Sequence, residues 1–164
     1  MIMKLKQNTI YIDEFKLKCA IGKGGIKKKI KEGDKITPRG LFSIGDLFYR
    51  ADRIDNFTTK LTKKKIKKDM GWCDDPNSKN YNRLIKLKKH NEHSFEKLFK
   101  TSKIYDFIIP IKYNYYEQEK NKGSAIFIHL TKDYKPTLGC IALKKKDFLI
   151  MLNLIDRKTK IKIY

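Results

Sequence analysis

A histidine and a cysteine in the last third of the chain are the side chains best suited to do chemistry. His129 lies near the end of AIFIHL, an apolar run of β-forming residues that we expect to be a buried strand. Cys140 follows after a loop in which Pro136 favours extended geometry. A thiolate is a strong nucleophile, and a nearby imidazole can take its proton and later pass it to a leaving amine. The pair therefore indicates acyl transfer in outline.

Gly139 strengthens this interpretation because it frees the backbone just before the thiol. A sharp turn there can aim the backbone N–H groups from Leu138 to Cys140 at one point, where an oxyanion would form. A cysteine and a histidine alone are weak evidence, however. A buried structural cysteine and an unrelated histidine would give the same pattern, so the surrounding sequence has to decide.

The composition predicts one folded domain, residues 1–164, with a strong positive charge. Hydrophobic residues make up 40% of the chain, which is too much for a disordered protein. The formal charge of +21 would attract any polyanion. Few of the basic residues are Arg, the side chain that reads bases best, so we expect no specific nucleic-acid partner. We expect solvated faces or loops at the lysine clusters Lys27–Lys29, Lys63–Lys65 with Lys67 and Lys68, and Lys144–Lys146.

The number of cysteines bears on disulfide bonds, and the hydropathy of the chain bears on membrane spans and export signals. Cys19, Cys73 and Cys140 are an odd number in a chain too long to need disulfide stapling, so at least one thiol should be free. No apolar run approaches the roughly 20 residues of a membrane span. Met1–Phe15 lacks the apolar core of a signal peptide, so no export signal is visible. We expect no transmembrane segment and a monomer.

Two other groups of residues could bind ligands. Asp74 and Asp75 in GWCDDP could bind a metal or act as acid and base, but adjacent carboxylates in a turn diverge. A structural turn with an Asp contact to Arg83 is the simpler interpretation. His90 and His93 lack a second ligand pair at zinc-finger spacing, so we expect surface residues and neither a metal nor a cofactor.

The glycine-rich segment IGKGG at 21–25 resembles a phosphate loop. It lacks the Gly-Lys-Ser/Thr ending and a following helix, so we expect β-turns there.

The hydrophobic periodicity predicts mostly strands and two short helices. One helix should begin after Ser94, and another should span 148–155 with Asp147 as its cap. Arg50 and Arg53 could face either solvent or an anionic cleft. The fold class is therefore a β-rich α+β domain. The expected strands are Thr9–Ile12, Phe15–Ile21, Leu41–Ile44, Leu47–Arg53, Ile104–Tyr113 and Ile161–Ile163.

The order of these motifs resembles the catalytic domain of L,D-transpeptidases, the YkuD-type family, and in particular its small single-domain branch. The matching pieces, in chain order, are IGKGG, EGD with TPRGLFSI, FYRADR, GWCDDP with YNR, YDFIIPIKYN, GSAIFIH and PTLGCIAL. The resemblance implies a β-sandwich or mixed-sheet domain with an active-site cleft. It also implies an enzyme that acts on peptidoglycan stem peptides in the periplasm or cell envelope, without a cofactor.

In this family a thiolate attacks the carbonyl at the L-centre of the third residue of a stem tetrapeptide and expels the terminal D-alanine. An amine of a neighbouring stem then takes the acyl group. The resemblance makes Cys140 the nucleophile, His129 the base, and the backbone at Leu138 and Gly139 part of the oxyanion site. The candidate residues on the substrate side are Ser124, Thr137, Trp72 and Arg83.

Two features depart from the family pattern. Ala142 stands where many members have Arg or Asn, and the interval from His129 to Cys140 is shorter than in the larger branches. The alternatives are an L,D-carboxypeptidase of the same chemistry, in which water replaces the amine, an inactive basic module that binds an anionic polymer, and a cytosolic cysteine protease.

Overall fold

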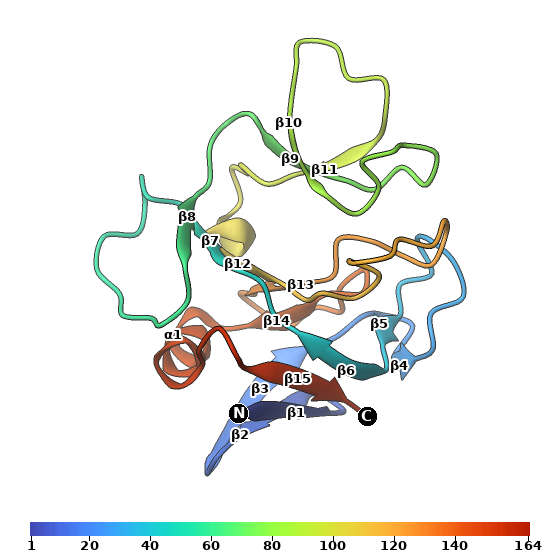
Figure 1. Ribbon diagram of the computed structural model, residues 1–164. Helices are drawn as coiled ribbons and strands as arrows, with labels where there is room; N and C mark the ends of the chain where they lie inside the picture. The colour runs from blue at the N-terminus through green and yellow to red at the C-terminus, as the bar shows by residue number, and fades with distance from the viewer.

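The computed structural model describes residues 1–164, and a ten-stranded mixed sheet forms its centre (Figure 1). Neighbouring strands are antiparallel except for three parallel pairs, β15 with β1, β14 with β13, and β7 with β8. In spatial order the strands are β6 (Gly40–Ser43), β15 (Lys160–Ile163), β1 (Ile2–Lys6), β2 (Thr9–Ile12), β3 (Phe15–Ala20), β14 (Ile141–Leu143), β13 (Phe127–Leu130), β12 (Phe107–Pro110), β7 (Leu47–Tyr49) and β8 (Lys63–Lys65).

Two smaller sheets and two helical segments complete the fold. The three-stranded sheet lies on the opposite side of β12 and β13 from α1, and both termini lie close to β1 and β15 (Figure 1). The three-stranded sheet is β10 (Leu84–Lys86), β9 (Met70–Cys73) and β11 (Phe95–Lys97); the two-stranded sheet is β4 (Ile26–Lys27) and β5 (Thr37–Pro38). The helical segments are α1 (Lys145–Leu154) and the 3₁₀ turn η1 (Lys103–Tyr105).

The large sheet curls until its β6 edge meets the end of β12. The N–H of Gly45 donates to the carbonyl of Pro110 at 2.7 Å, and the N–H of Lys112 donates to the carbonyl of Ser43 at 2.9 Å. Ile44 and Ile111 form a β-bridge between the two segments. These bonds satisfy backbone groups that an open edge would leave unpaired.

Side-chain alternation along the central strands separates two hydrophobic cores. Ile128 and Leu130 of β13 face the interior of the curl, where 24 buried residues form the main core. Helix α1 contributes to this core through Phe148, which stacks on Phe107 with a centroid distance of 5.3 Å. Phe127 points to the other face and joins a cluster of eight buried residues beneath the three-stranded sheet. The period of two along a strand therefore decides which residues face which core.

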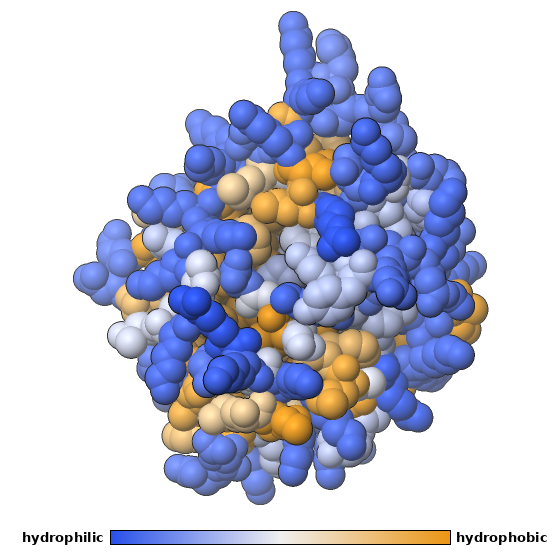
Figure 2. All heavy atoms as spheres, viewed as in Figure 1, coloured by the Kyte–Doolittle hydropathy of each residue, from blue (hydrophilic) through white to orange (hydrophobic).

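The rest of the surface is dominated by charge. Figure 2 shows hydrophilic side chains over most of the visible face, with smaller hydrophobic patches between them. No helix is long and apolar enough to span a bilayer. Cys19, Cys73 and Cys140 are all free and buried.

The β-rich class and the mixed sheet agree with the sequence prediction, but the two-helix prediction is wrong. Phe95–Lys97, expected in a helix after Ser94, is strand β11, because Phe95 pairs with Cys73 and Lys97 pairs with Gly71. Apolar residues three apart in so short a run fit either structure, and pairing with β9 decides it. The large sheet curls on itself instead of stacking against a second one, so the sandwich is not observed.

The single α-helix also begins differently from the prediction. Lys144 is the N-cap and makes no side-chain capping bond, while Asp147 lies inside the first turn. A carboxylate there still interacts favourably with the helix dipole.

Two predicted strands are shorter in the structure. Leu47–Arg53 ends as a strand at Tyr49, and Ile104–Tyr113 is a strand only from Phe107 to Pro110. Residues 103–105 form the 3₁₀ turn η1, which turns Tyr105 toward the smaller core.

The contact between α1 and the sheet gives a test of the main core. Phe148 is fully buried, so Phe148→Ala should lower the free energy of unfolding by about 3–5 kcal/mol through lost burial and a residual cavity. Urea denaturation followed by circular dichroism measures this change. Exposed Lys146→Ala, on the same helix, should stay within about 0.5 kcal/mol of the unsubstituted protein. Equal effects of the two substitutions would contradict this assignment of the core.

Candidate active site

The register of β13 and β14 places His129 and Cys140 on one face of the sheet. His129 pairs with Ala142 across the two parallel strands, and Cys140 lies two residues before Ala142. Residues two apart on a strand share a face, so Cys140 lies on the same side as His129. That face is the one that carries the smaller core under the three-stranded sheet.

The thiol of Cys140 is held by the backbone of the segment before β13. Its Sγ accepts a hydrogen bond from the N–H of Phe127 at 3.3 Å and donates to the carbonyl of Ala125 at 3.3 Å. Burial raises the pKa of the Cys140 thiol to about 12, although the N–H of Phe127 opposes this shift. At neutral pH the resting side chain is therefore a protonated thiol that points to Ala125.

His129 is buried in its neutral form with one nitrogen fixed. Its Nδ1 lies 2.8 Å from the carbonyl of Leu130, which can only accept, so Nδ1 carries the proton and Nε2 keeps a free lone pair. Burial lowers the pKa of His129 to about 4. The ring of Tyr105 packs edge-on against the imidazole, with centroids 5.2 Å apart. The tautomer is thus set for accepting a proton at Nε2.

The turn before Cys140 depends on the backbone freedom of Gly139. Gly139 has φ +134°, and a Cβ there would lie 3.0 Å from the carbonyl oxygen of Ile36, so only glycine fits without strain. The N–H of Gly139 donates to Thr137 Oγ1 at 3.1 Å, and Thr137 Oγ1 donates to the carbonyl of Cys140 at 2.6 Å. The N–H groups of Leu138 and Cys140 donate to no protein acceptor, whereas the N–H of Gly139 is bonded to Thr137.

Thr37 connects this turn to the glycine-rich segment. Its Oγ1 accepts from the N–H of Gly22 at 2.8 Å and donates to the carbonyl of Gly139 at 2.9 Å. A Cβ on Gly22 would lie 2.9 Å from the Cα of Gly139, so the glycine permits this close approach. The expected β-turn at Gly25 is present, with a bond from its N–H to the carbonyl of Gly22. The segment supports the thiol turn directly.

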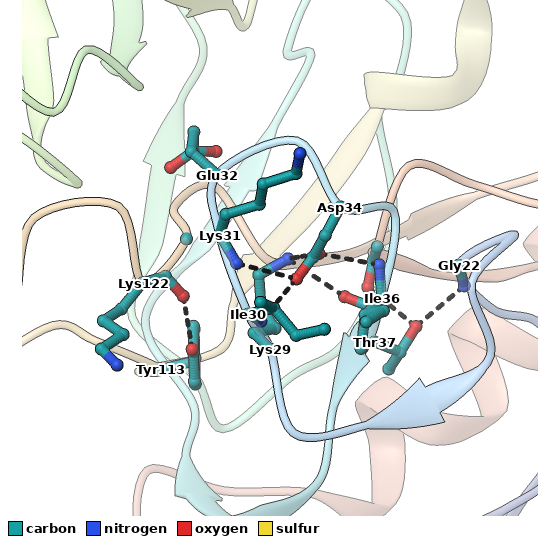
Figure 3. Close-up of polar contacts among 12 residues, drawn as sticks. Gly22, Lys29, Ile30, Lys31, Glu32, Asp34, Ile36, Thr37, Tyr113 and Lys122 are labelled. Atoms are coloured by element: carbon teal, nitrogen blue, oxygen red, sulfur yellow. Dashed lines mark hydrogen bonds and ion pairs between the residues drawn. The ribbon is translucent and has the colours of Figure 1, made fainter.

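A buried ion pair fixes the loop on the other side of Thr37 (Figure 3). Lys29 Nζ contacts Asp34 and donates to the carbonyl of Ile36 at 3.3 Å. The same carboxylate accepts the N–H groups of Ile30 at 2.8 Å and Ile36 at 3.0 Å. These bonds hold the pKa of Asp34 below its usual value, despite the opposing effect of burial. The prediction that Lys29 is solvated is wrong, because Asp34 provides its counter-charge inside the fold.

A cavity of about 600 Å³ brings several of the predicted site residues together. It is lined by Cys140 and His129, and also by Ser124, Thr137 and Leu138. Ser124 Oγ is buried and has no hydrogen-bond partner.

Ala142 lines the same cavity beside its strand partner His129.

Trp72 and Arg83 do not line this cavity. Trp72 is buried and packs edge-on against Phe127 at 5.2 Å, while Arg83 lies over the ring of Tyr115 at 4.8 Å. Trp72 Nε1 donates to Asn82 Oδ1 at 2.9 Å, and the same oxygen accepts the N–H of Ala125 at 3.1 Å. Trp72 therefore acts on the thiol's surroundings through Asn82 rather than by direct contact with the cavity.

The carboxylates of GWCDDP make different contacts from the expected one. Ser94 Oγ donates to Asp74 at 2.5 Å, and Asp75 pairs with His93 at 2.8 Å. The expected Asp contact to Arg83 is absent. These contacts join the β9 turn to β11, as a structural turn would. His90 and His93 lie at the surface, as expected.

Arg50 and Arg53 both point to the segment that follows β11. Arg50 donates to the carbonyl of Lys100 at 2.5 Å, and Arg53 donates to the carbonyl of Thr101 at 3.0 Å. Arg53 also pairs with Asp106 at 2.9 Å. The two arginines thus fix the backbone on either side of η1, which carries Tyr105, and face neither open solvent nor a free anionic cleft.

Sequence reasoning missed three residues that shape the site: Tyr105, Thr37 and Asn82. Thr37 and Asn82 lie inside the quoted motifs TPRG and YNR. The motifs mark these residues but do not reveal which contacts they make. Tyr105 lies inside the quoted motif YDFIIPIKYN as well, but its position looked like part of a regular strand.

The thiol of Cys140, directly before β14, and the neutral imidazole of His129 on β13 line one cavity, and cysteine acyl transfer uses a thiol with an imidazole. Residues 2–163 match the L,D-transpeptidase catalytic domain family, YkuD, so the protein belongs to this family. Comparisons with curated proteins and with solved structures gave no match. The family assignment confirms the resemblance seen in the motifs, and the family acts on peptidoglycan.

The burial of His129 predicts a pH-dependent stability. Its folded pKa of about 4 lies below the usual 6.5, so below pH 6.5 the unfolded chain binds a proton that the folded one does not. His129 therefore lowers stability as pH falls from 6.5 to 4, by about 3 kcal/mol in total. His129→Gln should remove this part of the loss, and urea denaturation at pH 7 and pH 4.5 measures it. Equal pH slopes in both proteins would contradict the assignment.

The hydroxyl of Thr37 predicts a difference between two substitutions of similar size. Thr37→Val should lower the free energy of unfolding by about 1–3 kcal/mol, because the buried N–H of Gly22 and the carbonyl of Gly139 lose their partner. Thr37→Ser keeps the hydroxyl and should lose less. Urea denaturation compares the two variants, and an equal loss would show that the methyl group, not the hydroxyl, stabilises the turn.

Proposed function

We propose that the protein is a peptidoglycan L,D-transpeptidase with Cys140 as its nucleophile and His129 as its base. The observation that carries the proposal is the shared cavity. His129 lines it from β13, and Cys140 lines it from the position just before the parallel strand β14. Nε2 of His129 has a free lone pair because Nδ1 is bonded to the carbonyl of Leu130.

The first half-reaction starts from a protonated thiol. A substrate carbonyl that enters the cavity displaces the thiol from Ala125, and Cys140 turns toward the substrate. Nε2 of His129 takes the proton while Sγ attacks the carbonyl carbon at the L-centre of the third stem residue. Because burial raises the pKa of Cys140 and lowers that of His129, a stable ion pair does not form first, and proton transfer accompanies attack.

The tetrahedral intermediate is stabilised by the unpaired N–H groups of Leu138 and Cys140. Collapse of the intermediate breaks the C–N bond, and the imidazolium of His129 gives its proton to the nitrogen of the leaving D-alanine. A thioester on Cys140 remains. An acceptor amine then attacks the thioester, His129 takes the amine proton, and this proton returns to the released thiolate.

Water in place of the amine gives the L,D-carboxypeptidase reaction through the same thioester. Both reactions release D-alanine, so only the second product separates them. A cross-linked dimer indicates transfer, and a free tripeptide indicates hydrolysis.

A carbapenem tests the nucleophile. The thiol of Cys140 should open the β-lactam carbonyl–nitrogen bond, with the proton passing to the ring nitrogen, and so add the mass of one whole carbapenem. Intact-protein mass spectrometry with peptide mapping locates the adduct. Cys140→Ala should stay unmodified, while Cys73→Ala, which removes another buried free thiol, should be labelled like the unsubstituted protein. An unmodified wild-type mass under these conditions would overturn the proposed chemistry.

A further inference from the structure

A second pocket lies where the curled sheet closes, apart from the Cys140 cavity. Its volume is about 240 Å³, and its walls come from residues 44–46, the end of β12 and the three-stranded sheet. It shares no lining residue with the Cys140 cavity. The pocket therefore takes no direct part in the chemistry proposed for the thiol.

The charge of this pocket also differs from that of the Cys140 cavity. Three cations, Lys64, Lys112 and Arg157, line it together with one carboxylate, Asp46. Asp46 pairs with Lys64 at 2.8 Å, so Lys112 and Arg157 are left without a carboxylate partner. Four lysines and four carboxylates line the Cys140 cavity, which is balanced although the chain as a whole carries +21. The excess of positive charge thus distinguishes this pocket, and it would concentrate anions there.

Lys112 is held in place by neutral groups. Its Nζ donates to the hydroxyl of Tyr116 at 3.3 Å and lies 5.5 Å from the centre of the Tyr115 ring. Its backbone N–H makes one of the two bonds that close the sheet, to the carbonyl of Ser43. An ammonium has three donors, and aromatic rings do not cancel its charge. The side chain is therefore fixed while its charge stays available to an anion.

The pocket continues along β10. Leu84, which is 38% exposed, lines both this pocket and an adjoining one that Lys67 and Lys86 also line. The carboxylate of the adjoining pocket, Asp69, faces Lys86 at 3.7 Å, so Lys67 is a further cation without a carboxylate partner. We call the two joined pockets the Trp72 groove, after the tryptophan that lines the first. Separate unpaired cations on both sides of an apolar residue suit a chain with repeated negative charges better than a single ion.

The side chains of the Trp72 groove favour phosphate groups and offer no platform for bases. Two of the three unpaired cations are lysines, which bind phosphate as point charges, whereas arginine is the better match for planar carboxylates. Bases bind by stacking on open aromatic faces. Trp72 is only 4% exposed, and the Tyr115 ring already carries the guanidinium of Arg83 at 4.8 Å and the ammonium of Lys112 at 5.5 Å.

We propose that the Trp72 groove binds a phosphodiester polymer that has no bases, a polyol phosphate chain. One phosphate pairs with Lys112 and Arg157, the polyol that follows lies on Leu84, and the next phosphate reaches Lys67. Binding there leaves the Cys140 cavity open, because the two sites share no residue. The inference goes beyond the proposed function and does not depend on it.

The test titrates the protein with poly(glycerol phosphate) in low-salt buffer. Calorimetry gives the affinity, and the emission of Trp72, the only tryptophan, reports whether the polymer enters the groove. Lys112→Gln and Arg157→Gln should each weaken binding about fivefold or more, because each removes a phosphate partner. Lys146→Gln removes the same charge from an exposed position on α1 outside the groove and should weaken binding less than about twofold.

Equal losses in the three variants, or binding that leaves the emission of Trp72 unchanged, would mean that the polymer is held by net charge alone and would overturn the site. Tighter binding of an oligothymidylate with the same number of phosphates would overturn the choice of a polymer without bases. Cys140→Ala should bind poly(glycerol phosphate) as the wild type does. Absence of binding in both proteins would overturn this inference whether or not a carbapenem labels Cys140, so the groove and the proposed chemistry are tested separately.

Discussion

The parallel pairing of β13 with β14 is the constraint on which the rest of the site depends. Sheet hydrogen bonds fix the two strands in register, and a shift by one residue would turn Cys140 to the main core and separate it from His129. All the residues of both strands are buried, so register is specified by packing on both faces. Backbone pairing therefore sets the position of Cys140 relative to His129.

The surrounding segments control the access to this strand pair and its local polarity. Thr37 connects the thiol turn to the glycine-rich segment, and Asn82 connects the three-stranded sheet to the backbone that receives the thiol proton. Arg50 and Arg53 hold the segment that carries Tyr105. Each of these contacts joins residues far apart in the sequence. The cavity beside Cys140 and His129 is thus assembled from segments far apart in the chain.

The sequence predicted the parts of the fold that follow from local alternation and from motif order. Local patterns predicted the strand Thr9–Ile12, the buried strand that ends after His129 and the glycine turn at Gly139. Side-chain periodicity and backbone freedom are local properties, so the sequence alone contains them. The sequence did not predict that β11 is a strand, because this depends on pairing with β9, which lies over twenty residues away in the chain. The burial of Lys29 was hidden for the same reason: a lysine run looks solvated until a carboxylate is folded against one member. Trp72 was the most conspicuous aromatic, yet its contacts place it behind the cavity.

The hydrogen bonds of the Cys140 thiol have a consequence for its chemical durability. Oxidants such as peroxide attack thiolates, and the sulfur climbs from sulfenic to sulfinic acid only where the deprotonated form is present and accessible. A buried thiol with its pKa raised to about 12 and its proton on the carbonyl of Ala125 presents almost no thiolate at neutral pH. Such a resting state would let a cysteine-dependent protein keep its reduced form in oxidising surroundings, without a partner cysteine or a reductase to repair it.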